Sequence, residues 1–138
     1  MDKAFRKQAE EWFERGLHDI ETAQLLYDER GYTDSIAYHI QQAIEKYLKG
    51  YLVLNGKKPP KIHELDTLLN HVSGFDDSFN GFLELCEKAS RYYIEDRYPP
   101  GPIVGYEYSE IKADLDKAWE LIRNILAIAK MPYGKAVA

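Results

Sequence analysis

Cationic and aromatic side chains gather in one short segment of the chain, residues 91–99, which reads RYYIEDRYP. Arg91 and Arg97 offer forked guanidinium donors, and Tyr93 and Tyr98 offer flat rings beside them. This combination suits the phosphates and bases of a nucleotide or of RNA. A more ordinary role is also open, because a cation is favoured at a helix C-terminus and two carboxylates lie between the arginines. We expect one arginine to be paired and the other to be available to a ligand.

A second candidate is the segment 61–65, KIHEL, which directly follows two prolines. His63 stands at the expected start of a helix, where backbone N–H groups favour an anion, and Lys61 would add a second cation. The imidazole could instead cap its own helix, and the sequence favours neither interpretation. His63 and His71 are eight residues apart, which matches no zinc or di-iron spacing. We therefore expect no metal site and no cofactor.

A third, secondary candidate is a stripe of polar residues on a helix expected over residues 35–54. The stripe consists of His39, Gln42, Lys46 and Lys49. Their spacing places them on one helical face, which could bind an anion or an RNA backbone. An ordinary solvated face is the better interpretation, and Glu45 beside Lys46 partly neutralises the stripe.

These candidates need helices to position them, and the sequence has the pattern of a helical bundle. Apolar residues recur with a helical period in the segments 2–28, 35–54, 61–72, 79–96 and 111–129. Glycines and prolines separate the segments, and short connections favour antiparallel neighbours. We predict an all-α, up-down-up-down four-helix bundle with one extra short helix, in which Gly16 allows close approach of a neighbouring helix. The acidic residues of the first segment, including Asp19, are expected on a solvated face.

The segment 35–54 should organise the bundle because it has a wide apolar face. That face consists of Ile36, Ile40, Ile44, Tyr47, Leu48, Tyr51 and Leu52. With 45% hydrophobic residues, the 138-residue chain is expected to form a single domain over 1–138. Its core should span about residues 2–130 and be followed by a frayed C-terminal tail.

Charge and composition narrow the classes of function. The net charge is −5, so a general nucleic-acid binder is not expected, and any site for RNA must be a local cluster. Cys86 is the single cysteine, which excludes a disulfide framework and is expected to be a buried, inert thiol. The N-terminus does not resemble a signal peptide, and no apolar run approaches the ~20 residues that span a bilayer. We expect a cytoplasmic protein without a membrane segment.

Three motifs, QQAIEKYLKGYL at 41–52, KPPKIHEL at 58–65 and RYYIEDRYP at 91–99, follow one another with helices between them. In this order and spacing the chain resembles the HEPN family (higher eukaryotes and prokaryotes nucleotide-binding domain) from about residue 13 to residue 129. The resemblance implies an all-α bundle. Many proteins of this family are metal-independent RNases. Their catalytic signature is an Arg, four to six residues and then a His, and the catalytic site is completed in a symmetric dimer.

In this sequence the arginine of that ribonuclease signature would be Arg91. The matching histidine positions hold Asp96, Arg97 and Tyr98, so the signature is absent. Arginine stays protonated and cannot replace histidine as an acid or base near neutral pH. We therefore predict no catalytic residue and lean against an enzyme.

A second branch of the HEPN family resembles the chain better: small stand-alone proteins in which RYP, here residues 97–99, closes the late helix. The resemblance to these proteins implies a partner, a minimal nucleotidyltransferase, in a toxin–antitoxin-like pair. The predicted function is a homodimeric module that binds a nucleotide, RNA or that partner. The alternatives are a divergent metal-independent RNase that acts as a homodimer with His39 or His63, and a structural dimeric subunit.

Overall fold

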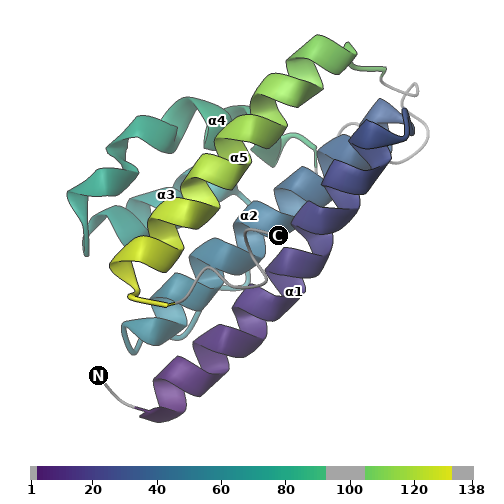
Figure 1. The fold of residues 1–138 in the computed structure, drawn as a ribbon. Helices are drawn as coiled ribbons and strands as arrows, with labels where there is room; N and C mark the ends of the chain where they lie inside the picture. The colour runs from purple at the N-terminus through teal and green to yellow at the C-terminus, as the bar shows by residue number, and fades with distance from the viewer. Residues whose placement is uncertain (1–2, 93–104, 132–138) are drawn as a thin grey trace.

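The computed structural model describes residues 3–92 and 105–131, and every regular element in this part of the chain is helical (Figure 1). The elements are α1 (Lys3–Asp28), α2 (Thr33–Leu54), α3 (Leu65–Ser73), the 3₁₀ helix η1 (Asp77–Phe82), α4 (Leu83–Ser90) and α5 (Tyr108–Ile128). The three long helices α1, α2 and α5 run alongside one another, and α3 and α4 lie together on one side. The predicted all-α helical bundle is confirmed. None of the described helices is long and apolar enough to cross a membrane.

Helix α2 lies at the centre of the bundle and packs against α1, α3, α4 and α5. All seven residues of its predicted apolar face are buried. The burial extends beyond that face, because every residue of α2 is buried or half-buried. Polar residues of α2 must therefore find partners inside the bundle, since an unpaired buried polar group is costly.

Two glycines set the close contact between α1 and α2. A Cβ atom at Gly50 would lie 2.6 Å from the Phe13 ring, and one at Gly16 would lie 2.7 Å from the Tyr47 ring. Those two rings stack with their centroids 5.3 Å apart. The predicted close approach at Gly16 is confirmed, and Gly50 provides the matching gap on the partner helix.

The predicted long helix over 79–96 is wrong within the described residues. The chain first forms η1, with the Asp76 carboxylate accepting a hydrogen bond from the Ser78 N–H at 2.8 Å. Phe79 and Phe82, three residues apart, are both buried by the three-residue repeat of this helix. The α-helix α4 follows and ends at Ser90, while residues 93–96 lie outside the described residues.

The short helix also differs from its prediction. Helix α3 begins at Leu65 and not near residue 61, because the chain before it is extended, with Glu64 at the N-cap. Residues 57–64 therefore form an irregular connection between α2 and α3. Lys61 and His63 both belong to this connection.

Candidate functional site

The polar stripe of α2 is not a solvated face. His39 and Lys46 both turn toward α1, where they share the carboxylate of Asp19. His39 Nδ1 lies 2.9 Å from Asp19 Oδ1, and Lys46 Nζ donates to the other carboxylate oxygen. Asp19 is itself only 9% exposed, so its prediction as a solvated residue is wrong. The antiparallel packing of α1 on α2 encloses this charge, and the two α2 donors compensate it.

Asp19 is held as an anion. Burial raises the pKa of this carboxyl group, but the hydrogen bonds from His39 and Lys46 outweigh burial and leave the pKa below its ordinary value. An ionised carboxylate can only accept hydrogen bonds, so the Nδ1 atom of His39 carries the shared proton. The same contact fixes the orientation of the imidazole ring.

The lowered pKa predicts how Asp19 contributes to stability as the pH changes. The contribution is complete above the ordinary pKa of 3.8 and disappears as the pH falls toward the lower pKa of the folded state. Asp19→Asn should therefore be less stable than the wild type near neutral pH, and the difference should shrink below about pH 4. Urea denaturation at about pH 7 and about pH 3 measures both values. A difference that stays constant across this window would contradict the assignment.

A second carboxylate, Glu45, lies on the side of α2 that faces the α2–α3 connection and is 7% exposed. Lys49 Nζ donates to its Oε2 atom at 3.0 Å, and Gln41 Nε2 donates to its Oε1 atom at 3.0 Å. His63 Nδ1 approaches the same carboxylate at 3.0 Å. Glu45 therefore partly neutralises the polar stripe, as predicted, and does so through Lys49, while Lys46 pairs with Asp19. Gln42 joins this network by donating to Gln41 Oε1 at 2.7 Å.

His63 does not cap helix α3, so that interpretation is wrong. Glu64 occupies the N-cap position and its side chain makes no capping hydrogen bond to the helix. The Leu65 N–H instead donates to Ser90 Oγ at 2.7 Å, which ties the start of α3 to the end of α4. The His63 side chain remains 45% exposed while Glu45 holds one edge of its ring.

The Leu65–Ser90 contact brings two sequence candidates to one place. Arg91 follows Ser90 at the C-cap of α4 and is exposed, and His63 precedes Leu65 by two residues. Lys61 is exposed on the same connection. We call Lys61, His63, Glu64, Ser90 and Arg91 the α3 corner. Three predicted site residues, Tyr93, Arg97 and Tyr98, lie outside the described residues, so the expected pairing of one arginine stays a prediction.

Sequence reasoning missed three of the partners that hold these side chains, Asp19, Gln41 and Ser90, and it did not place Glu45 in the interior. A signal existed for the second network, because residues 41, 45 and 49 follow an i, i+4, i+8 spacing that lets their side chains meet on a helix. None existed for Asp19 and Ser90, whose contacts join different helices.

Other chemistry is limited in the described part of the chain. No group of three or more His, Cys, Asp or Glu residues there could hold a metal ion. Cys86 is buried, and burial together with the charge of Asp66 raises the pKa of its thiol to about 12. The thiol is therefore protonated near neutral pH and a poor nucleophile.

Comparison with known proteins agrees with this architecture. The family model described as HEPN domain matches residues 9–131. A protein of Methanocaldococcus jannaschii named "Putative toxin MJ1304" is 27% identical over 135 residues, which cover 90% of this chain and 87% of that protein. No solved structure matches the chain. Because the family model spans most of its length, the chain belongs to the HEPN domain family.

Proposed function

We propose that this chain is a HEPN binding module that recognises a nucleotide or RNA at the α3 corner. It acts as a homodimer in the cytoplasm, paired with a minimal nucleotidyltransferase in a toxin–antitoxin-like system. Membership of the HEPN family supports the nucleotide-related role. The similarity to a protein named as a toxin supports the toxin–antitoxin setting.

The observation that carries the proposal is the Leu65–Ser90 hydrogen bond, which brings the chain segment of Lys61 and His63 next to the end of α4 that bears Arg91. Lysine, histidine and arginine can all donate hydrogen bonds to a phosphate, and arginine does so with two parallel bonds. The N-terminus of a helix further favours an anion. Two carboxylates oppose this charge. Glu64 accepts from the His63 N–H at 3.1 Å, and Asp66, in the first turn of α3, accepts from Ser90 Oγ at 3.4 Å.

The corner is also held in place before any ligand arrives. The buried Glu45 fixes the His63 ring, and Ser90 Oγ fixes the first residue of α3. Ser90 in turn donates to the Cys86 carbonyl at 2.8 Å, one turn earlier in α4. Groups that are ordered in advance lose less entropy on binding, which favours affinity for a small ligand.

Replacing Arg91 by alanine tests this assignment. We expect binding of ATP or of a fluorescein-labelled single-stranded RNA to weaken about ten-fold, because a charge-assisted hydrogen bond is worth about 1.5–3 kcal/mol. Arg123→Ala is the matched control, since it removes an exposed arginine from α5. Fluorescence anisotropy measures RNA binding, calorimetry measures ATP binding, and capture of a co-expressed nucleotidyltransferase measures pairing. Unchanged values in all three assays would contradict the α3 corner as the site.

An RNA cleavage assay and a measurement of oligomeric state, beside these titrations, separate the two alternative functions. A divergent metal-independent RNase is favoured by the imidazoles of His39 and His63, each held by a carboxylate as acid–base groups often are. RNA that is shortened in EDTA, and spared when both histidines are replaced by glutamine, would establish that activity. Wild-type protein that dimerises but binds neither nucleotide, RNA nor nucleotidyltransferase would favour the structural subunit.

A further inference from the structure

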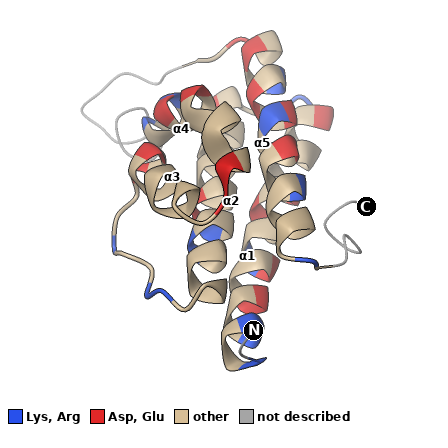
Figure 2. Cartoon of the chain, turned by 90° about the vertical axis from the view of Figure 1, so that its left-hand side faces the viewer, with Lys and Arg blue, Asp and Glu red and all other residues tan. Residues whose placement is uncertain are grey.

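Positive charge is concentrated in one stretch of this acidic chain. Residues 46–63 contain five lysines and no aspartate or glutamate. Lys46 and Lys49 are compensated by the carboxylates of the interior. Lys57, Lys58 and Lys61 are exposed and make no ion pair with any other described residue. Figure 2 shows basic residues along this connection between α2 and α3, whose one acidic residue, Glu64, is the last before α3.

The first part of this connection is a defined turn. The Gly56 N–H donates to the Val53 carbonyl at 2.9 Å, and the Lys57 N–H donates to the Leu52 carbonyl at 2.9 Å. This pair of hydrogen bonds is the Schellman motif, and Gly56 has the positive φ of 77° that the motif requires. Two prolines at 59–60 then restrict the chain. The backbone that presents Lys57 and Lys58 is therefore fixed on both sides.

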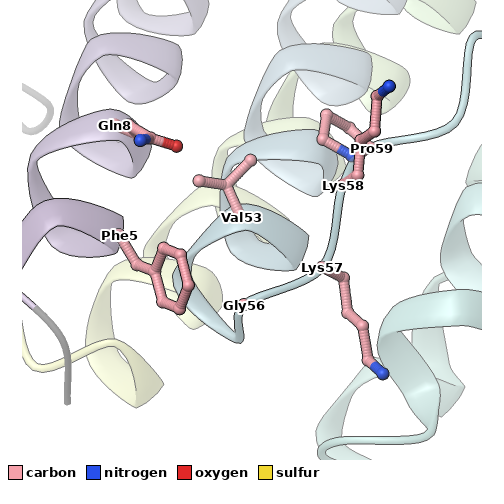
Figure 3. A pocket seen from close by; sticks show the side chains of 7 residues that line it. All are labelled: Phe5, Gln8, Val53, Gly56, Lys57, Lys58 and Pro59. Carbon is pink, nitrogen blue, oxygen red and sulfur yellow. The ribbon is translucent and has the colours of Figure 1, made fainter.

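Lys57 and Lys58 lie between two shallow hollows, and each hollow contains a partly exposed aromatic ring. The first hollow, of about 270 Å³, is shown in Figure 3 and is lined by Phe5, Gln8, Val53, Gly56, Lys57, Lys58 and Pro59. The second, of about 350 Å³, is lined by Leu52, Lys57, Lys58, Pro60, His71 and Phe75. The Phe5 ring is 38% exposed and the Phe75 ring 41%. Neither set of lining residues, all described, contains a carboxylate.

The size of the hollows limits what they can hold. Pockets that enclose a whole small molecule usually have volumes of about 300–1,000 Å³. Each hollow is at or near the lower end of that range, which suits a single flat base and not a complete cofactor. Proteins that bind single-stranded nucleic acid combine cations for the backbone with aromatic rings for successive bases. Lys57 and Lys58 on the fixed turn, flanked by the rings of Phe5 and Phe75 from other parts of the fold, have this arrangement.

We propose that the turn after α2 is a binding site for single-stranded RNA, in which Lys57 and Lys58 contact phosphates and the flanking hollows each receive a base. The proposal rests on the function proposed above, that RNA is a ligand, and adds a second contact region at the other end of the connection from the α3 corner. Lys61 is the residue of the α3 corner that lies nearest to the turn along the chain. An RNA strand that follows the connection would pass all three lysines.

A simpler interpretation is that these lysines only keep the turn in water and that Phe5 only covers Gly56. A Cβ atom at Gly56 would indeed lie 3.1 Å from the Phe5 ring, so the ring and the turn are in contact. That contact does not explain the hollow on the other side of the same lysines or the exposed Phe75 ring in it. The two interpretations differ in what substitution of the lysines does to RNA binding.

The experiment is a titration of a labelled single-stranded RNA of about 10 nucleotides at several salt concentrations between about 50 and 200 mM. The variants are the Lys57→Ala, Lys58→Ala double mutant and Phe5→Leu, which keeps an apolar side chain over Gly56. The control double mutant, Lys112→Ala with Lys117→Ala, removes the same charge from α5. Arg91→Ala is measured in parallel, and circular dichroism verifies that each variant is folded.

We expect loss of the two turn lysines to reduce the slope of log affinity against log salt by about 1.4, because each phosphate contact on a single strand contributes about 0.7. Phe5→Leu should weaken binding about ten-fold with little change in slope, since stacking is worth about 1–3 kcal/mol per base. The α5 double mutant should change neither quantity appreciably.

The outcomes separate this proposal from the function on which it rests. Turn variants that bind like the wild type, beside a weakened Arg91→Ala, would overturn the turn site and leave the α3 corner. Weakened turn variants beside an unchanged Arg91→Ala would support the turn and exclude the corner as the RNA site. A reduced slope with no effect of Phe5→Leu would refute the base contact at Phe5. A wild type that binds no RNA would overturn the turn site, and the ATP titration would then decide separately on the α3 corner.

Discussion

Replacing Glu45 by alanine will lower the free energy of unfolding by about 3–5 kcal/mol, the usual cost of removing one partner from a buried ion pair. Glu45 and Lys49 have side chains only 10% and 7% exposed, with 3.0 Å between Nζ and Oε2. Without the carboxylate, the ammonium group of Lys49 stays buried with no compensating charge. Gln41 and His63 lose a hydrogen-bond acceptor as well. Urea denaturation followed by circular dichroism measures the loss.

Two further proteins make this test specific to the buried charge. Asp116→Ala breaks the exposed pair with Lys112 and should cost less than about 1 kcal/mol. Replacing Glu45 by leucine and Lys49 by methionine together removes both charges and should recover most of the lost stability, because buried ion pairs are often no better than apolar residues of similar size. If the double variant were as unstable as Glu45→Ala, the uncompensated lysine could not be the cause.

Phe79→Ala will also destabilise the protein by about 3–5 kcal/mol, because it empties a fully buried aromatic site. Phe79 belongs to η1, and its ring packs on Tyr51 of α2 with centroids 5.2 Å apart. The ring thereby joins the side of the bundle formed by α3, η1 and α4 to the central helix α2. Thermal and urea denaturation should both register the loss, and the urea midpoint should fall while the m-value stays close to that of the wild type.

Phe75→Ala is the matched control for Phe79. The Phe75 ring also packs edge-on against Tyr51, with ring centroids 6.4 Å apart, but Phe75 is 41% exposed. We expect a loss of about 1 kcal/mol or less, since an exposed ring gives up little apolar burial. Similar losses for the two variants would show that burial does not decide their contributions.

The sequence was sufficient to predict the fold because the strongest signal, the apolar period of α2, belongs to its central element. Residues such as Ile40, Ile44 and Leu48 are all fully buried as predicted. Gly16 was equally informative, because only a residue without a side chain permits the approach to Tyr47. Both signals are local, and local patterns are what a single sequence records.

The details that failed depend on contacts between distant residues. Asp19 looks like one acidic residue among several on α1, and only the packing of α2 against it makes it a buried partner of His39 and Lys46. Residues 79–90 have an acceptable α-helical period, yet burial of Phe79 and Phe82 favours a 3₁₀ start. Tertiary packing outweighs a local preference in both cases.

The candidate site was predicted only in outline. The sequence indicated Lys61, His63 and Arg91 by residue type, but it gave no reason to place them together. A hydrogen bond between residues 65 and 90 does so, over a separation of 25 residues. Contacts of this range have no periodic signature, so no inspection of spacing could have revealed the corner.

No residue of α2 is fully exposed, and this has a consequence for how the protein can vary among related chains. A helix without an exposed position tolerates few substitutions, since most changes alter either packed volume or a compensated charge. Relatives that recognise different ligands would therefore have to differ in the segments that α2 supports, such as the connection 57–64 and the end of α4. The central helix would then stay nearly constant among relatives, and ligand specificity would depend on the short segments attached to it.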